Sequence, residues 1–355
     1  MEGLVSAHGL SFVNRRHFDT QRLEKASTDL QNCINTFELA KLWGDGAAVA
    51  VDGTKFNMYE QNLMAEPHIR YGGWGGIGLN YVADNYIAWL CHFITCGTWE
   101  GIYLFDGYFS NESDIKPHTF YSDTQGQSAP IFALAYLLGA DLKPRIRKIK
   151  KLVFYKPAKE EYYQHIEALF DNKNAIDWEL LQTHWFDLIK VGLSIRAGRI
   201  VPSSLLKKLG TYSRKNRLYH VFRELGRVMR TEFLLRYIQD IEMREEITAA
   251  TNKAESYNWF SKWLFFGDGG IISTNDRTEQ EKCLKYNHLV TNAVILQNVA
   301  DLTKVVAELT KEGYPVTKET LRFTSPYMLD NINRLGTYSL DMNVFESFPD
   351  YTLLL

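Results

Sequence analysis

The stretch Ala47-Ala48-Val49-Ala50-Val51-Asp52-Gly53-Thr54-Lys55-Phe56-Asn57 predicts a β-strand that carries a carboxylate at its centre. The apolar residues before Asp52, and Phe56 after it, are typical of a buried strand. An Asp-Gly pair by itself is more often a turn than a ligand. A charge inside a buried strand, however, costs free energy unless it is paired or bound to a metal. We therefore interpret Asp52 as a candidate functional residue at the centre of the fold.

Helices and strands alternate around this strand in the first part of the chain. Apolar spacing predicts helices over 20–42 and 128–138. Residues 118–123 form a short β-prone run that ends at a second acid, Asp123. The run Gly72-Gly73-Trp74-Gly75-Gly76-Ile77-Gly78 holds five glycines in seven residues and predicts a flexible or tightly turned loop. This alternation indicates an α/β core with a central sheet.

The pattern becomes helical after about residue 156. Helices are predicted over 160–170, 178–195, 203–209, 217–239 and 243–266. The last of these carries a third acid, Glu255, with Trp259 and Lys262 on the same face four and seven residues on. We expect an α/β core that a large all-helical insertion interrupts before Glu255. The regions are an N-terminal helical segment (1–42), the first part of the core (43–156), the basic insertion (157–242), the returning core (243–312) and an irregular or helical tail (313–355).

The three acids Asp52, Asp123 and Glu255 stand in three different predicted elements. Their oxygen ligands suit Mg²⁺, and two such ions about 3.5–4 Å apart can activate an attacking oxygen and stabilise a leaving one. Cleavage and transfer of phosphodiesters need this arrangement. Taken singly, Asp52 is better explained by a turn and Glu255 by a solvated helix face. Four other aspartates are rival ligands, namely Asp45, Asp84, Asp106 and Asp114. We interpret Asp106 as a turn residue.

Charge is unevenly distributed along the chain. The total is −2, but residues 141–236 hold 21 Lys and Arg against 10 Asp and Glu, a net of +11, which leaves −13 for the rest. Such asymmetry indicates a basic surface for a polyanion and an acidic site elsewhere. Six basic residues lie within 143–151, and 11 lie within 196–236 beside only two acids.

The second basic run contains a stripe at helical spacing. His220, Arg223, Arg227 and Arg230 fall on one helical face. A solvated face is the usual explanation of a single basic helix, whereas two neighbouring runs of the same sign make phosphate contact an equal alternative. The residues predicted to contact DNA are Arg145, Arg147, Lys148, Arg196, Arg223, Arg227, Arg230 and Lys253.

Several classes of protein are disfavoured by composition. The sequence has no run of 18 apolar residues that would span a membrane, and its start lacks the pattern of a secretory signal. The four cysteines, Cys33, Cys91, Cys96 and Cys283, fit no zinc-site spacing and are interpreted as reduced thiols. We therefore expect a cytoplasmic protein with no membrane partner.

Taken together, ordered motifs between about Thr36 and Asn333 resemble the catalytic region of the transposases of replicative unit transposons, the Tn-three family. Each motif alone is weak, but their order and spacing are highly specific. In the first half they are Lys41-Leu42-Trp43-Gly44-Asp45-Gly46 before Asp52-Gly53, then Tyr121-Ser122-Asp123-Thr124, Phe132-Ala133-Leu134 with Leu137-Leu138-Gly139, and Lys143-Pro144-Arg145-Ile146-Arg147. Later come Ser194-Ile195-Arg196-Ala197-Gly198, Leu225-Gly226-Arg227 with Arg230-Thr231, Asn252-Lys253-Ala254-Glu255, and the run Leu289 to Asn298.

The resemblance implies an RNase H-like mixed-sheet core with a helical insertion before the last acid. It implies a DDE mechanism in which Asp52, Asp123 and Glu255 bind two Mg²⁺ ions, for which Mn²⁺ can substitute. Water would first cleave at the transposon end and free a 3′-hydroxyl, which would then attack a target phosphodiester. The implied partners are transposon-end and target DNA, and the DNA-bound protein is expected to be a homo-oligomer.

The chain also departs from the family pattern. Family members are much longer, so this sequence is expected to be a fragment, a truncated reading frame or one part of a split protein. Residues 47–51 are more apolar than is usual for the family, and 121–127 differ slightly from its pattern. Two alternatives to an active transposase therefore remain. One is a catalytically silent remnant that binds DNA or partner subunits, and the other is a stand-alone nuclease of the RNase H fold.

Overall fold

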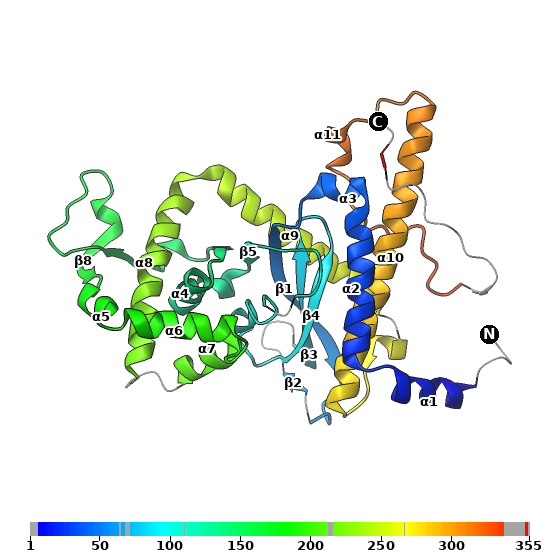
Figure 1. Cartoon of the computed structure of the whole chain (residues 1–355), viewed down its shortest axis with the longest axis horizontal. Coiled ribbons are helices and arrows are strands. Elements are labelled where there is room, and N and C mark those ends of the chain that lie inside the picture. Colours follow the sequence, from blue (N-terminus) through cyan, green and yellow to red (C-terminus); the bar gives the residue numbers. More distant parts are fainter. Residues whose placement is uncertain are drawn as a thin grey trace.

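A mixed seven-stranded sheet forms the centre of the protein (Figure 1). The computed structural model describes residues 6–63, 65–67, 72–109, 111–211, 216–265, 267–336 and 352–353. The strands within these residues are β1 (Ala48–Met58), β2 (Glu66–Pro67), β3 (Trp74–Ala83), β4 (Ala88–Thr95), β5 (Thr119–Ser122), β6 (Asp141–Pro144) and β9 (Ile271–Ile272). The main path is β2-β3-β1-β5-β6, and in addition β4 pairs with β3 and β9 with β1.

Strand direction divides the sheet at β1. Strand β3 runs antiparallel to both β1 and β4, whereas β5 and β6 run parallel to β1. The strand predicted over 47–57 is confirmed as β1, and Val49, Ala50 and Val51 are buried as a central strand requires. Because β5 and β6 run parallel to β1 and end beside its middle, the residues that follow β5 and β6 lie next to the central residues of β1.

The glycine-rich stretch was wrongly predicted as a loop throughout. Only Gly72 and Gly73 take the left-handed conformation of a turn, and the stretch from Trp74 onwards belongs to β3. A Cβ at Gly76 would lie 2.2 Å from the ring of Phe93. The next strand glycine, Gly78, is covered by the ring of Phe56 in the same way. These glycines are therefore strand residues that let aromatic rings lie flat on the sheet.

Helices from both ends of the chain cover the β4 side of the sheet. These are α2 (Thr20–Thr36), α3 (Glu38–Trp43) and α10 (Arg277–Lys311), with α1 (Ala7–His17) preceding them and α11 (Lys318–Leu321) following them. Figure 1 shows α2 and α10 side by side. Buried amide and imidazole groups of Gln31, His288 and Asn292 all donate to or contact the carbonyl of Ala88 on β4. This polar cluster fixes the two helices on the sheet. Among the described helices, none is both long enough and apolar enough to cross a lipid bilayer.

The helical half of the protein lies beyond β6 (Figure 1). It packs around α4 (Ala129–Leu138), which was predicted over 128–138, and comprises α5 (Trp178–Thr183), α6 (Trp185–Arg196), α7 (Pro202–Thr211) and α8 (Arg217–Gln239). From α8 the chain returns through α9 (Ile241–Leu264) to lie across β1 and β3. Single 3₁₀ turns span Glu100–Tyr103, Thr124–Gln127, Ile149–Lys151, Glu167–Leu169 and Gly267–Gly270.

The inserted region is not all-helical, which corrects the prediction. The strands β7 (Phe154–Lys156) and β8 (Phe170–Ala175) form a parallel two-stranded sheet. The helix predicted over 160–170 is absent, and turns stand in its place. The reason is local, because buried Lys156 binds Glu167 at 2.5 Å and also donates to the carbonyl of Glu161. These contacts fold the segment back on β7 instead of letting it extend as a helix.

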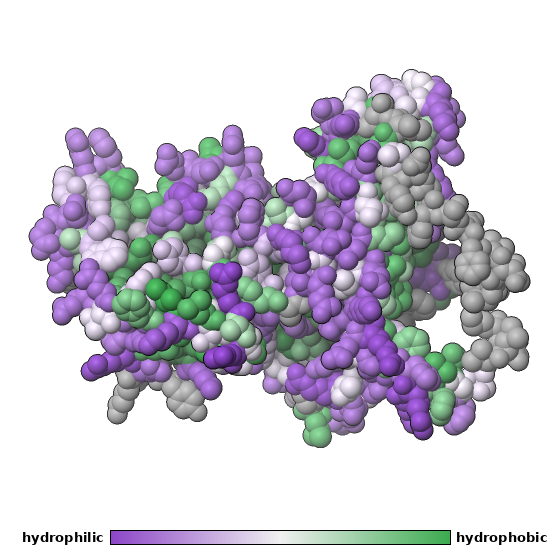
Figure 2. Space-filling view, in the orientation of Figure 1, coloured by the Kyte–Doolittle hydropathy of each residue, from purple (hydrophilic) through white to green (hydrophobic). Residues whose placement is uncertain are grey.

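The outer surface is mostly hydrophilic, with an apolar patch over α6 (Figure 2). Phe186 and Leu193, which are 75% and 60% exposed, contribute to this patch.

A tight helix crossing gives the first testable prediction. A Cβ at Gly226 of α8 would lie 1.8 Å from the carbonyl oxygen of Ala129 at the start of α4. Backbone cannot yield as a side chain can, so Gly226→Ala is expected to lower the free energy of unfolding by about 1–3 kcal/mol. Chemical denaturation measures this loss.

Gly192→Ala on α6 is the matched control for that substitution. Its Cβ would meet the carbonyl of Leu137, also on α4, at 3.2 Å, a much milder contact. The gain of about 1 kcal/mol in helix propensity on replacing glycine by alanine should offset it. Equal effects of the two substitutions would contradict the close α4–α8 contact.

Candidate active site

Asp52 lies in the middle of β1 and is held by two asparagines. Asn80, directly opposite on β3, donates to the side-chain oxygen of Asn258 at 2.8 Å. Asn258 of α9 in turn donates to Oδ2 of Asp52 at 2.9 Å. Both asparagines are buried. The chain of hydrogen bonds ties helix α9 to the sheet at Asp52 and orients its carboxylate.

The register of the parallel strands aligns the next two residues with Asp52. Val51 pairs with Ser122, and Ser122 pairs with Pro144. The residues that follow Val51, Ser122 and Pro144 are Asp52, Asp123 and Arg145, and these therefore lie side by side. Asp123 also accepts a hydrogen bond from the backbone of Gln125, which caps the 3₁₀ turn after β5. A row of two acids and one arginine thus forms where β5 and β6 end beside the middle of β1.

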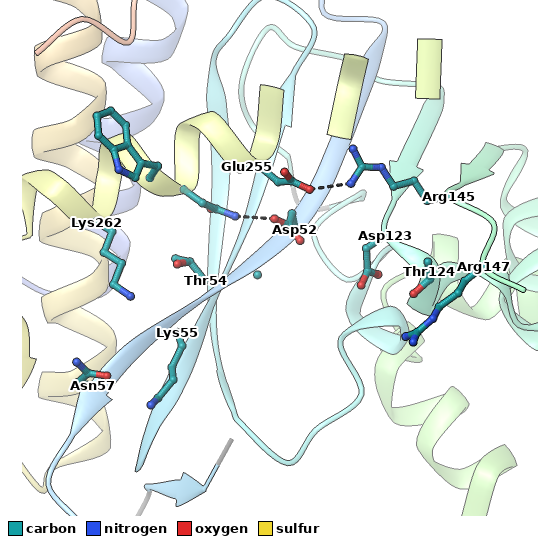
Figure 3. Close-up of a pocket in the computed structure, with 13 residues that line it drawn as sticks. Asp52, Thr54, Lys55, Asn57, Asp123, Thr124, Arg145, Arg147, Glu255 and Lys262 are labelled. Atoms are coloured by element: carbon teal, nitrogen blue, oxygen red, sulfur yellow. Dashed lines mark hydrogen bonds and ion pairs between the residues drawn. The ribbon is translucent and has the colours of Figure 1, made fainter. Parts of the chain in front are cut away.

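Glu255 reaches the same place from helix α9. Its carboxylate accepts from Nη1 of Arg145 at 2.7 Å, and Nη2 of Arg145 donates to the side chain of Asn252 at 2.5 Å. Figure 3 shows Glu255 and Arg145 facing each other above Asp52 and Asp123. About half of the Glu255 side chain is exposed. The third acid is therefore present at the site, but it is paired with a cation of the protein.

These residues line one cleft with a volume of about 1010 Å³ (Figure 3). The cleft contains the three acids together with four basic residues, namely Lys55, Arg145, Arg147 and Lys262. The remaining lining residues are Gly53, Thr54, Asn57, Thr124, Asn258 and Trp259. An acidic floor and basic walls suit a ligand that carries both phosphate groups and cations.

The cleft disfavours ionisation of Asp52. Burial, followed by the negative charges of Asp123 and Glu255, raises the pKa of Asp52 to about 6, although hydrogen bonds from Asn258 and from the backbone of Gly53 act in the opposite direction. The direction of this shift means that burial and the two neighbouring acids together disfavour the charged form of Asp52. A bound cation would favour that form.

The donor set fits Mg²⁺, because all three candidate ligands are carboxylates and Asp52 is destabilised in its charged form. The acids are not yet gathered as ligands of a single ion. Within the described part of the chain, no three His, Cys, Asp or Glu side chains are close enough to form a metal cluster. The pairing of Glu255 with Arg145 is one cause of this separation.

The rival aspartates have structural roles away from the cleft. Asp84 accepts from the backbone of Gly46 at 2.8 Å, and Asp45 accepts from that of Ala47 at 2.9 Å. Asp106 accepts from the backbone of Ser203 at 2.7 Å and so joins the turn after the first 3₁₀ helix to α7. Asp114 is exposed. None of the four lines the acidic cleft.

The predicted DNA contacts divide into two groups. Arg145 and Arg147 line the cleft, and Lys148 follows them as an exposed residue in the left-handed conformation. Arg196 is exposed at the end of α6 and does not line the cleft. We call residues 145–151 the basic rim, because the run reaches the cleft at Arg145 and Arg147, whereas Lys143 pairs with Glu246 outside it.

The arginine stripe on α8 is largely used in packing. Arg227 binds Glu224 at 2.6 Å and stacks over Tyr155, while Arg223 lies over Tyr219. Burial lowers the pKa of Arg230, whose Nε is enclosed. These three arginines are half-buried and lie outside the acidic cleft.

Lys253 also points away from the acids. Its ammonium group donates to the carbonyl of Asp84 and lies 4.0 Å from the ring centre of Tyr86. Burial lowers its pKa to about 8, although the charge of Asp84 opposes the shift. Lys253 thus anchors α9 on the β3–β4 turn and does not face the cleft.

Sequence reasoning missed Asn80, Asn258 and Lys55. Asn258 follows Glu255 by three residues, so helical spacing alone would have placed it on the same face. Lys55 is buried and donates to the carbonyl of Gly72. No local signal identifies Asn80, because its role depends on the register between β1 and β3.

A cleft in which three acids and four basic residues meet on a mixed α/β sheet defines a candidate site for acting on phosphodiesters. The family model for the Tn3 transposase DDE domain matches residues 1–338, and the chain belongs to this family. The match is wider than the region from Thr36 to Asn333 on which the sequence motifs lie.

Known transposases are similar over almost the whole chain. The chain is 31% identical to the transposase of transposon Tn501 from Pseudomonas aeruginosa and 30% identical to that of Tn1546 from Enterococcus faecium, in each case over 93% of this chain and 33% of the relative. It is 28% identical to the transposase of transposon gamma-delta from Escherichia coli K12, over 95% of this chain and 34% of the relative. The chain therefore spans about a third of the length of these relatives.

The raised pKa of Asp52 predicts a stability that depends on pH. The stabilising contribution of protonated Asp52 is fully present below its ordinary pKa of 3.8 and is lost as the pH rises through about 6. Asp52→Asn removes this penalty and is expected to raise the free energy of unfolding of the metal-free protein by about 2 kcal/mol at pH 8, after allowance for partial solvent exposure.

The same substitution should change the stability by only about 0.5 kcal/mol at pH 4, where most of the linkage has vanished. Urea denaturation of both proteins at the two pH values in EDTA gives the comparison. A gain that is the same at both pH values would show that charge repulsion at Asp52 is not its cause.

The Arg145–Glu255 ion pair is expected to weaken metal binding, because it engages one of the three candidate ligands. Arg145→Gln removes the cation that holds Glu255 and is expected to tighten Mn²⁺ binding by up to about fivefold in the absence of DNA, the scale of a partly exposed ion pair. Titration followed by electron paramagnetic resonance measures free Mn²⁺ directly.

Arg147→Gln is the control, because it removes the same charge from the same cleft and leaves the Arg145–Glu255 pair in place. A similar gain from both substitutions would mean that general electrostatics, and not release of Glu255, sets the metal affinity.

Proposed function

We propose that this chain is a transposase catalytic domain that cleaves DNA at a transposon end and transfers the resulting 3′-end to target DNA. The observation that carries the proposal is the meeting of Asp52, Asp123 and Glu255 in one cleft with basic walls. Membership of a family described as a transposase DDE domain supports it. The relatives are named as transposases of whole transposons, and this chain corresponds to about a third of each.

We further assign the core to the RNase H-like fold. The strand order β4-β3-β1-β5-β6, with β5 and β6 parallel to β1, supports this assignment. On this basis the core comprises 43–156 and 243–312, with 1–42 before it, the insertion 157–242 within it and 313–355 after it. The insertion would join β6 to the helix of the third acid, so its packing on α4 would affect where Glu255 stands.

Each side chain has a defined part in the proposed reaction. Asp52 and Asp123 would hold cations where β5 ends beside β1, and Glu255 would complete the site from α9. Two Mg²⁺ ions, or Mn²⁺ in their place, would supply activation of the attacking oxygen and neutralisation of the leaving one. Arg147 and Lys262 would bind phosphates on the two sides of the cleft. Asn258 would keep the Asp52 carboxylate oriented throughout.

The proposed chemistry needs no covalent protein–DNA bond. In the first step, water would add to the scissile phosphorus and the 3′-oxygen would leave as a hydroxyl. In the second step, that 3′-hydroxyl would attack a target phosphodiester, lose its proton and displace the target 3′-oxygen. Both steps are exchanges at phosphorus, so the same three acids would serve them in turn.

A silent remnant is the second candidate. The pairing of Glu255 with Arg145 favours it, because a permanently paired third acid could not bind metal. Such a protein would still bind DNA through the basic rim around residues 145–151.

Substitution of the acids separates the two candidates. With a pre-cleaved transposon-end duplex, target DNA and Mg²⁺ or Mn²⁺, the wild-type chain is expected to produce joined strands. Asp52→Asn, Asp123→Asn and Glu255→Gln should each reduce the rate by about a thousandfold or more, because loss of metal stabilisation costs several kcal/mol. Gel analysis of the joined product gives the rate.

Asp114→Asn is the matched control, an exposed aspartate outside the cleft that should leave the rate unchanged. Circular dichroism and thermal unfolding establish that each variant folds. Full activity in any acid variant would remove that acid from the trio. Absence of product from a folded, DNA-bound wild type would favour the remnant.

A further inference from the structure

Helix α9 presents an aromatic ring to the cleft as well as an acid. Glu255, Trp259 and Lys262 all line the cleft, at spacings of four and seven residues that place them on one helical face. Of the intervening side chains, Tyr257 and Phe260 are buried, while Asn258 reaches Asp52 at the floor of the cleft. This face of α9 is thus turned to the cleft, while the opposite face packs on the sheet.

Trp259 is unusually open for its residue type. The residue is 61% exposed, although an indole ring gains more from burial than almost any other side chain. Its helical neighbours already provide the buried contacts that hold α9 on the core. Packing of the helix therefore does not explain a tryptophan at this position. A ligand that covers the indole ring would explain it.

The charges around Trp259 identify the kind of ligand. Lys55, Arg147 and Lys262 supply positive charge in the same cleft, which suits phosphates. A ligand that carries both phosphates and flat rings is a nucleic acid strand. Bases stack on aromatic side chains irrespective of sequence, and such stacking is a main source of affinity for unpaired strands.

Helix geometry sets the distance from the ring to the reacting phosphate. Four residues of α-helix advance about 6 Å along the axis, so Trp259 lies about that far from Glu255. A stacked strand advances about 3.4 Å per nucleotide. The ring is therefore within about one or two nucleotides of a phosphodiester held by the acids.

We propose that Trp259 is a stacking platform for an unpaired nucleobase one or two nucleotides from the reacting phosphodiester. An interior base of a duplex has both faces covered by its neighbours, so such a base can stack on Trp259 only after it has left the duplex. The substrate at this cleft is accordingly a DNA end that is single-stranded or opened beside the reaction point. The placement of the phosphodiester rests on the proposed function, whereas stacking on Trp259 can be measured without any reaction.

Binding of labelled oligonucleotides tests the proposal. Fluorescence anisotropy measures binding in the presence of Ca²⁺, and this measurement does not depend on any reaction. The two probes are a blunt duplex and the same duplex with three unpaired nucleotides at its 3′-end. Trp259→Ala is expected to weaken binding of the unpaired probe about 5- to 150-fold and that of the blunt duplex much less. Trp259→Phe keeps an aromatic face and should retain most of the preference.

A base analogue locates the contact. With 2-aminopurine placed at each unpaired position in turn, the wild type should quench its fluorescence at one position, and Trp259→Ala should not. Replacing that nucleotide by an abasic one should remove the difference between wild type and Trp259→Ala. Phe186→Ala, an exposed aromatic on α6 outside the cleft, controls for general loss of apolar surface.

The outcomes separate this proposal from the proposed function. Equal weakening of both probes by Trp259→Ala, unchanged binding, or absence of any preference for unpaired DNA in the wild type would each overturn the stacking platform. Strand transfer that survives substitution of the acids would instead overturn the proposed chemistry and would leave the binding result standing.

Discussion

The register between three parallel strands is the constraint on which the site depends. Pairing of Val51 with Ser122, and of Ser122 with Pro144, places the residues after them in a row beside the middle of β1. A shift of one residue would turn Asp52 to the opposite face, because successive strand side chains alternate. The buried residues Val49, Val51 and Phe56 of the same strand oppose that shift, since it would move each of them out of its packed position. The hydrophobic core therefore fixes the position of the acids, although it contains none of them.

A second constraint is electrostatic. Asp52 is held among two other carboxylates, with burial and their repulsion raising its pKa. Without a metal, the nearest compensation is Arg145, which binds Glu255 and stands next to Asp123 by strand register. The hydrogen bonds from Asn80 to Asn258 and from Asn258 to Asp52 hold α9 on the sheet, while Arg145 pairs with Glu255 of the same helix. Metal ligation by Glu255 thus requires Arg145 to find another negative partner, and the phosphates of a bound strand are the natural one. On the proposed function, DNA binding and metal binding would assist each other.

The sequence predicted those features that depend on local pattern. A charged residue in an apolar strand identified Asp52, and helical spacing identified α4, α8 and α9. It failed where tertiary contacts decide the outcome. The glycines after Gly73 form a strand because the rings of Phe56 and Phe93 occupy the space above them. The turns over 160–170 form because Lys156 is buried against Glu167. The metal role of the three acids remains a prediction, and Asn80 could not be found at all without the strand register.

Basic charge within the chain serves two different purposes, which periodicity alone cannot distinguish. On α8, the guanidinium groups of Arg223 and Arg227 lie on aromatic rings, and Arg227 is neutralised by Glu224. Four basic residues of the rim are exposed, namely Arg147, Lys148, Lys150 and Lys151. None of them belongs to an ion pair in the described part of the chain. Phosphates gain most from cations that keep no internal partner, because no existing pair must be broken. On the proposed function, a DNA strand would meet these unpaired cations beside a cleft that Arg147, Trp259 and Lys262 line.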